Sequence, residues 1–175
     1  MGIENTEPGA EAAVDQSLEE ALSRLPDDAR LLAAQGLKAA RYASTEGYGY
    51  LGGLANMRVA ESGDGQSVLT MDVTPNILNG AGFVHGGMLF TLADYAMGAT
   101  TRTLLPEGSS AVTLEAKANY LRNVKEGKLI ARCETLRQTE RLITLETRIT
   151  DAATNELMMV VTGTFYVIRR GEEGD

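Results

Sequence analysis

The sequence predicts an α+β fold in which a curved antiparallel sheet of about six strands wraps around one long helix. The first observation is the segment 86–104, whose first fifteen residues place apolar or small side chains on every side of a helix. A helix that is apolar all round must be buried all round. The second is that residues 56–74 and 112–169 consist of short strand-like runs separated by turn residues. Because a flat sheet cannot enclose a helix, we expect this sheet to curl around it.

The N-terminal part of the chain is expected to differ from this body. Residues 1–16 are rich in Glu, Ala and Gly without apolar periodicity, which predicts disorder. Residues 17–46 are predicted to form a helical arm. Apolar side chains from Leu18 to Leu25 recur at helical spacing, and Pro26 followed by two acids favours the start of a second helix. The body then covers residues 47–170.

The strands of the body are predicted from alternation and turn signals. A hairpin is expected at Ser62-Gly63-Asp64-Gly65, between strands over 56–61 and 66–74. After the helix, residues 112–120 alternate apolar and polar side chains with a period of two. Three further strands are expected, over 129–136, 142–150 and 157–169. The last is apolar on both faces, which is typical of an interior strand, and residues 171–175 form a polar tail.

Composition excludes several classes of function. The net charge of −8 argues against binding to nucleic acid or an anionic membrane, because both need a cationic surface. No apolar run reaches the roughly 18 residues of a membrane span. A single Cys, Cys133, allows no intrachain disulfide and fits a reducing, cytoplasmic compartment. One Cys and one His cannot build a zinc site, and no metal or separate cofactor is expected.

Asp94 is an acidic residue in the middle of the apolar helix. A buried carboxylate is rare unless it is paired, because an unpaired buried charge is strongly unfavourable. Asp94 is therefore either a structural residue that caps a loop or pairs with an Arg, or a functional group. The helix alone does not decide between the two.

The loop that leads into the helix, residues 79–87, favours the functional interpretation. Its sequence is Asn-Gly-Ala-Gly-Phe-Val-His-Gly-Gly, so two glycines stand at the helix start. Glycines let backbone N–H groups approach a ligand oxygen, and a helix N-terminus carries partial positive charge. A tight turn without function is the alternative. If the loop is functional, it predicts an oxyanion site.

The spacing of the two features predicts a dimer. Gly86 and Asp94 are separated by about 12 Å along a helix at 1.5 Å per residue. Hydrolysis needs the attacking group and the oxyanion donors within about 3 Å of one carbonyl group. One helix cannot supply both to the same substrate, so a two-fold dimer with two shared sites is expected.

The loop and helix together contain the pattern N-x-x-G-x-x-H-G-G followed by A-D-x-A. Its members are Asn79, Gly82, His85, Gly86, Gly87, Ala93, Asp94 and Ala96. This pattern resembles the hotdog-fold acyl-coenzyme A thioesterases of the PaaI-like, phenylacetic-acid-degradation type. The resemblance covers roughly residues 50–169 and implies the hotdog fold, in which an antiparallel sheet wraps a central helix.

The resemblance also implies roles for individual residues. Asp94 is implied as nucleophile or general base, and the Gly86 amide as oxyanion donor. Asn79 is implied to orient the lytic water or the carbonyl, with His85 as a positioning residue beside it. The hydroxyl that the family carries on the strand after the helix falls on Thr113.

The substrate is expected to be an acyl-CoA thioester, hydrolysed to free acid and coenzyme A by a homodimer or a dimer of dimers. Gly87, Lys117 and Arg122 are expected to bind it, the two cations through the coenzyme A phosphates; Lys125 and Lys128 belong to the same basic cluster. A solvated hairpin is an equally good explanation of that cluster. Aryl-acyl and medium-chain acyl groups both remain open. The alternatives are a hotdog dehydratase acting on hydroxyacyl thioesters and a non-catalytic acyl-CoA-binding protein.

Overall fold

The computed structural model describes residues 18–46 and 49–169, which form two compact units that divide after Leu54. The predictions of a disordered segment over 1–16 and a tail over 171–175 lie outside the described residues. The boundary predicted between residues 46 and 47 stays a prediction, and Gly49–Leu54, the first described residues after it, are helical rather than extended.

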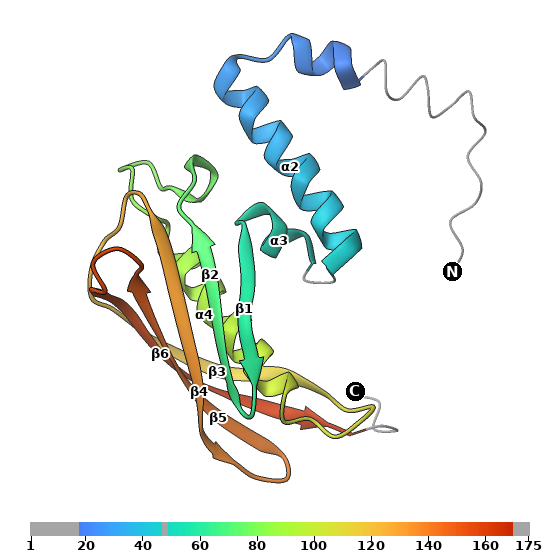
Figure 1. Cartoon of the computed structure of the whole chain (residues 1–175), viewed down its shortest axis with the longest axis vertical. Coiled ribbons are helices and arrows are strands. Elements are labelled where there is room, and N and C mark those ends of the chain that lie inside the picture. Colours follow the sequence, from blue (N-terminus) through green and yellow to red (C-terminus); the bar gives the residue numbers. More distant parts are fainter. Residues whose placement is uncertain (1–17, 47–48, 170–175) are drawn as a thin grey trace, which may run out of the picture. The chain divides into compact units, whose positions relative to one another are not determined.

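The first unit is helical (Figure 1). A short helix over residues 18–23 precedes α2 (Asp27–Glu46), and α3 (Gly49–Leu54) follows. α2 and α3 pack closely where Gly53 meets Ala39, since a Cβ on Gly53 would lie 2.8 Å from the Ala39 backbone. Only glycine fits that contact without a shift of the backbone.

The second unit contains a six-stranded antiparallel sheet and one long helix, α4 (Gly86–Arg102). The strands are β1 (Met57–Gly63), β2 (Gln66–Asp72), β3 (Ser110–Tyr120), β4 (Lys128–Gln138), β5 (Leu142–Asp151) and β6 (Leu157–Ile168). Their order across the sheet is β1-β2-β4-β5-β6-β3, so β1 and β3 are edge strands and β6 is paired on both sides. The predicted α+β class and the number of strands are confirmed.

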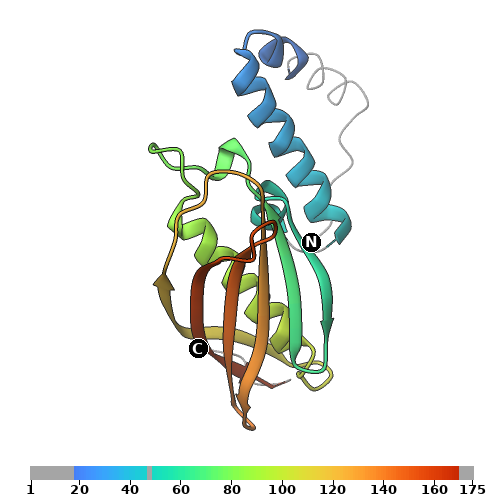
Figure 2. The same cartoon turned by 60° about the vertical axis from the view of Figure 1, so that its left-hand side comes forward.

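The sheet curves around α4, as Figures 1 and 2 show. Leu92, Ala93, Ala96 and Met97 of α4 are fully buried against the concave face. Burial of large side chains such as Leu92 supplies about 1.5–3 kcal/mol each relative to exposure. This hydrophobic contact, rather than helix propensity, holds α4 in place.

The burial of α4 is one-sided within a single chain, which differs from the expectation of burial all round. Residues spaced three or four apart, from Gly87 through Thr91, Asp94 and Gly98 to Arg102, form a stripe that is half-buried or exposed. The sheet reaches around one side of the helix only. The physical reason is that the curved six-stranded sheet covers the apolar side of α4 but does not close around the helix, so the stripe on the opposite side of α4 stays open.

The predicted β1–β2 hairpin is confirmed, and Asp64 and Gly65 occupy its turn with φ of 49° and 74°. Positive φ at both central residues is the type I′ arrangement that matches strand twist.

α4 ends at Arg102 rather than near Leu104. The hydroxyl of Thr103 donates to the Thr100 carbonyl at 2.8 Å and closes the last turn.

Strand β3 contains a β-bulge that the strict alternation of residues 112–120 did not predict. Thr113 pairs with Phe165 and Glu115 with Thr164, so Leu114 is the extra residue. A bulge shifts the side-chain phase by one position. Thr113 consequently shares the helix-facing side of the sheet with the buried Phe165, while Leu114 is 60% exposed.

Candidate active site

The loop before α4 is closed by Asn79. The carboxamide oxygen of Asn79 accepts hydrogen bonds from the Ala81 N–H at 2.9 Å and the Phe83 N–H at 3.2 Å. The Asn79 N–H donates to the Phe83 carbonyl at 2.7 Å, and Gly82 turns the chain with a φ of 75°. Because the side-chain oxygen holds the loop, the NH₂ group of Asn79 is the part that can contact a substrate or water.

His85 is the N-cap of α4. Its Nδ1 accepts from the Gly87 N–H at 3.1 Å, and its carbonyl accepts from the Met88 N–H at 2.8 Å. A ring nitrogen that accepts carries no proton, so the neutral ring is protonated on Nε2. The Gly87 amide is therefore occupied, and the Gly86 N–H is the first-turn donor left without an acceptor among the described residues.

Tyr120, at the end of β3, covers Gly86. Its hydroxyl donates to the Gly86 carbonyl at 3.3 Å, and a Cβ on Gly86 would lie 3.1 Å from the ring. The contact fixes the peptide at the helix start and explains why a residue without a side chain fits there. Nothing in the sequence pattern singled out Tyr120, because only the sheet register brings it to α4.

Asp94 lies on the open stripe of α4 and is half-buried rather than enclosed. The Thr113 hydroxyl donates to the Asp94 carboxylate at 2.8 Å. The bulge in β3 creates this contact, since it turns Thr113 towards the helix. Among the described residues Asp94 has no Arg partner and caps no loop. The structural interpretation of Asp94 therefore gains no support.

The predicted residues form two groups in one chain. Asn79, His85, Gly86 and Gly87 meet at the start of α4, and Asp94 and Thr113 meet at its middle. The rise of an α-helix separates Gly86 from Asp94 by about 12 Å, so neither group alone contains both an attacking group and an oxyanion donor. The roles implied for these six residues stay predictions.

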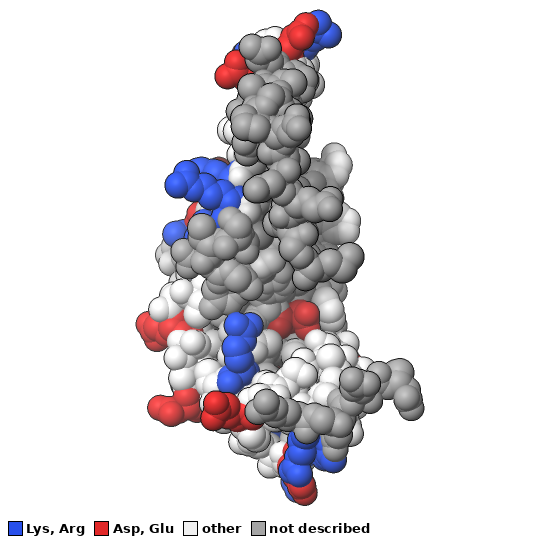
Figure 3. All heavy atoms as spheres, turned by 90° about the vertical axis from the view of Figure 1, so that its right-hand side faces the viewer, with Lys and Arg blue, Asp and Glu red and all other residues white. Residues whose placement is uncertain are grey.

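The four cations of the predicted basic cluster each have different neighbours in the fold. Arg122 pairs with Glu156 at 3.6 Å, and Lys128 pairs with Asp72 at 3.2 Å. Lys117 pairs across the sheet with Thr162, on the side of β3 opposite Thr113. Their binding roles also stay predictions. On the face drawn in Figure 3, basic and acidic side chains are interspersed rather than gathered by sign.

Lys125 is the cation that the fold brings to the loop. Its ammonium lies 4.6 Å from the centroid of the Phe83 ring, inside the segment that precedes α4. A cation over an aromatic face at this distance is an attractive contact. It places a positive charge beside the helix start.

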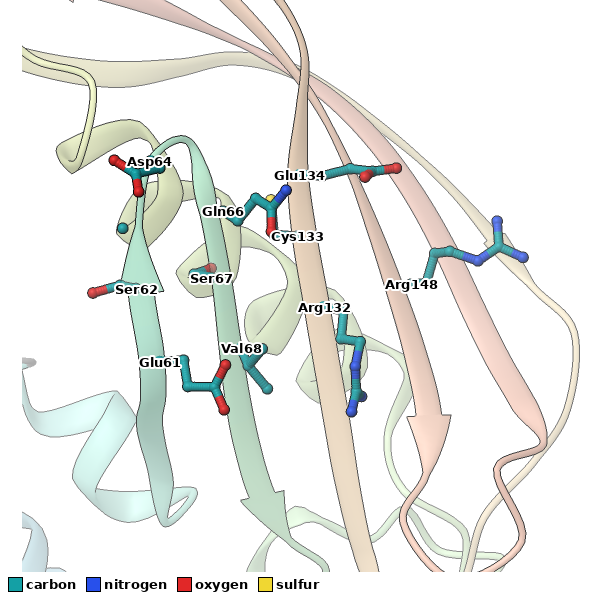
Figure 4. A pocket seen from close by; sticks show the side chains of 11 residues that line it. Glu61, Ser62, Asp64, Gln66, Ser67, Val68, Arg132, Cys133, Glu134 and Arg148 are labelled. Carbon is teal, nitrogen blue, oxygen red and sulfur yellow. The ribbon is translucent and has the colours of Figure 1, made fainter.

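A recess of about 600 Å³ lies elsewhere, on the face of the sheet opposite α4 (Figure 4). Arg132 and Arg148 face it from neighbouring strands, with Glu61 and Glu134 around them. None of the predicted site residues lines it.

Within residues 18–46 and 49–169, no group of three or more His, Cys, Asp or Glu side chains is arranged to hold a metal ion. The helices described here include none long and apolar enough to cross a membrane.

Comparisons with known proteins agree with this geometry. The thioesterase superfamily matches residues 81–157, which include the end of the loop, α4 and Thr113. An esterase-named protein of Saccharolobus solfataricus is 30% identical over 105 residues, which are 60% of this chain and 69% of that protein. Another esterase-named protein, from Archaeoglobus fulgidus, is 29% identical over 65% of this chain and 71% of its own length.

Solved structures extend the likeness. A Bacillus halodurans protein crystallised with CoA is 26% identical with a TM-score of 0.76, over 87% of this chain and 99% of that one. This match is longer than the second unit, so it extends into the first.

Two further structures match mainly the second unit. A thioesterase from Haemophilus influenzae is 26% identical with a TM-score of 0.65, over 69% of this chain and 84% of its own. The phenylacetic acid degradation protein PaaI from Thermus thermophilus is 26% identical with a TM-score of 0.58, over 63% of this chain and 91% of its own. With its curved sheet, its central helix and these relatives, the chain belongs to the hotdog-fold thioesterase superfamily.

Proposed function

We propose that this protein hydrolyses acyl-CoA thioesters at a site that two copies of the chain build together. Asp94 of one copy supplies the carboxylate, and the partner subunit's Gly86 supplies the oxyanion donor. Membership of the thioesterase superfamily supports the reaction class. Likeness to proteins crystallised with CoA, from Bacillus halodurans and Streptococcus pneumoniae, supports coenzyme A as the thiol portion.

The observation that carries the proposal is the stripe of α4 that the sheet leaves open. Asp94 lies on this stripe with its carboxylate fixed by Thr113, and the unoccupied Gly86 amide lies at the start of the same helix. Antiparallel pairing of two such helices would bring each Asp94 to the other copy's Gly86. A two-fold axis makes both contacts at once, because the same patch meets itself.

The edge strand β3 supports this pairing. It is eleven residues long, its outer backbone edge pairs with none of the described strands, and Val112 and Leu114 on it are 50% and 60% exposed. Long exposed edges are covered in stable proteins because they otherwise template aggregation. Pairing two β3 edges covers them and joins the two sheets beside the two α4 helices.

The chemistry follows from a carboxylate and an N–H donor on opposite sides of one carbonyl. In the direct route, Asp94 attacks the thioester carbon, the C–S bond breaks, and water later hydrolyses the resulting anhydride. In the general-base route, Asp94 removes a proton from the attacking water and the thiolate leaves with a proton. In both routes the Gly86 N–H stabilises the negative charge on the carbonyl oxygen, and the Thr113 hydroxyl orients the carboxylate.

The Asn79 NH₂ group and His85 Nε2–H complete the donor set at the helix start. Lys125, beside Phe83, is the best-placed cation for a coenzyme A phosphate, and Lys117 on β3 and Arg122 just after β3 remain proposed contacts. His85 is nine residues from Asp94 on the chain and caps α4 through Nδ1, so no observation favours the dehydratase alternative.

Thiol release from a panel of acyl-CoA thioesters, with mass spectrometry of the products, tests the proposal. We expect stoichiometric free coenzyme A and free acid. An enoyl thioester without free thiol would indicate the dehydratase, and tight binding without turnover would indicate the acyl-CoA-binding protein. Either result would overturn the proposed function.

A further inference from the structure

We infer that Tyr120 is a positioning residue for the donor groups at the start of α4, and that its hydroxyl sets the orientation of the peptide between Gly86 and Gly87. The inference rests on the proposed function, since it concerns how the oxyanion donor of that site is held. It adds a residue that the loop and helix pattern does not contain, because the contact comes from the end of β3.

The peptide between Gly86 and Gly87 is held from both sides. Its carbonyl accepts from the Tyr120 hydroxyl at 3.3 Å, and its N–H donates to His85 Nδ1 at 3.1 Å. Two successive glycines leave a first turn with more backbone freedom than other residues would, so these bonds restrict a segment that is intrinsically permissive. The preceding peptide, which carries the Gly86 N–H, is held through the His85 carbonyl, which accepts from the Met88 N–H at 2.8 Å. Of these three bonds, the one from Tyr120 comes from another element of the fold.

The Tyr120 ring adds a steric restriction to the hydrogen bond. A Cβ on Gly86 would lie 3.1 Å from Cε1 of the ring and 3.5 Å from Cζ, so the ring lies directly over the Gly86 Cα. Tyr120 is 55% exposed and therefore adds little to the hydrophobic core of the chain. Its place over the helix start is explained by the contact with Gly86 rather than by core packing.

The two hydrogen bonds on this peptide form a chain that ends at His85. A bond accepted by a peptide carbonyl polarises the N–H of the same peptide, and bonds in such a chain strengthen one another. The Tyr120 hydroxyl thereby strengthens the bond from the Gly87 N–H to His85 Nδ1, which keeps the proton of the neutral ring on Nε2. One chain of bonds thus holds two donors of the proposed site, the Gly86 N–H and the His85 Nε2–H.

β3 presents one hydroxyl to each of the two groups on α4. Thr113 donates to the Asp94 carboxylate at 2.8 Å, and Tyr120, seven residues later, donates to the Gly86 carbonyl. The two contacts differ in kind. Thr113 bonds the proposed reacting carboxylate itself, whereas Tyr120 bonds a carbonyl that takes no part in the reaction. Tyr120 therefore acts through the helix start and not on the substrate.

Tyr120→Phe tests the hydroxyl, because it keeps the ring over Gly86. We expect kcat for acyl-CoA hydrolysis to fall about threefold to tenfold, the worth of one hydrogen bond, while KM stays within about twofold. In a Gly86→Pro background the same substitution should change kcat less than about twofold, since the N–H that Tyr120 orients is gone. In a Thr113→Val background, which leaves the helix start intact, the full loss should remain. Equal losses in both backgrounds would show that the hydroxyl acts elsewhere, and would overturn the inference.

His85 is the single histidine of the chain and gives a readout that does not depend on activity. In protein labelled with nitrogen-15 histidine, Nδ1 should give the resonance of an unprotonated, hydrogen-bonded nitrogen. Tyr120→Phe should move that resonance towards the position of an unbonded one. Tyr166→Phe is the matched control and should leave it unchanged, because Tyr166 lies at the other end of the β3–β6 pair, opposite Val112. An unchanged Nδ1 resonance in Tyr120→Phe would contradict the inference.

The two measurements also separate this inference from the proposed function. If wild-type protein hydrolyses no acyl-CoA, the proposed function fails, and the Nδ1 resonance still decides whether Tyr120 holds the helix start. If wild-type protein is active and Tyr120→Phe changes neither kcat nor the Nδ1 resonance, the inference fails and the proposed function stands.

Discussion

The start and the middle of α4 are held in place by different forces. The start is built mainly by local contacts: hydrogen bonds that span a few residues join Asn79, His85 and the glycines, and Tyr120 of β3 adds a long-range bond to Gly86. The middle depends on long-range packing, since the Asp94–Thr113 contact needs the register of an edge strand and its bulge. One chain therefore contains a locally built loop at the start of α4 and a carboxylate on the open stripe at its middle, and the proposed function requires a second copy to bring the two groups together.

Asp94→Asn should have the largest effect on catalysis. The substitution keeps the shape and the half-exposed position but removes the nucleophile or base, so kcat/KM should fall roughly 10³-fold or more. The free energy of unfolding should change by less than about 1 kcal/mol, because no buried ion pair is broken. Thioester hydrolysis and chemical denaturation are the measurements. Retained activity in folded protein would exclude the catalytic role.

Gly86→Pro tests the other end of the helix. Proline removes the amide hydrogen but suits the first position of a helix, and His85 before it has φ −61° and ψ 130°, which proline tolerates. The loss of one oxyanion donor should lower kcat about 10²–10³-fold while helix content in circular dichroism stays constant. Gly86→Ala is the control that keeps the N–H and needs only a small shift of Tyr120. A proline variant as active as the alanine variant would contradict the assignment.

Thr113→Val should have a smaller effect. It removes one hydrogen bond to Asp94 and keeps the β-branched shape on β3, so kcat/KM should fall about fivefold to tenfold. Thr113→Ser retains the hydroxyl and should stay near the wild-type rate. Equal losses in the two variants would show that packing in the bulge, and not the hydroxyl, matters.

The smallest expected effect is on stability and concerns Cys133, a buried residue of β4 in the core between the sheet and α4. Burial raises the pKa of its thiol above the ordinary value of 9.0. The unfolded chain therefore loses this proton first, so stability should be constant below that pH and fall as the pH rises above it. Denaturation of wild type and Cys133→Ala across this range should show a steeper decline for wild type. Parallel curves would contradict the burial.

Sequence patterns predicted those features that depend on local order. The turn at Asp64-Gly65, the helix start at Gly86 and the strand runs follow from backbone preference and periodicity. The bulge at Leu114 could not be predicted from the sequence, because an alternating pattern assumes that every residue of a strand has a partner on the next strand. Tyr120 was missed for a related reason: only the register of β3 places its ring over Gly86.

Mixed dimers test the shared site most directly. One chain carries Asp94→Asn and the other carries Gly86→Pro, and the two are unfolded together and refolded in equal amounts. If each site combines Asp94 of one copy with Gly86 of its partner, half of the dimers hold one intact site. Activity should then recover to about a quarter of wild type, although each variant alone is inactive. A mixture that stays inactive while mass spectrometry shows mixed dimers would contradict the shared site.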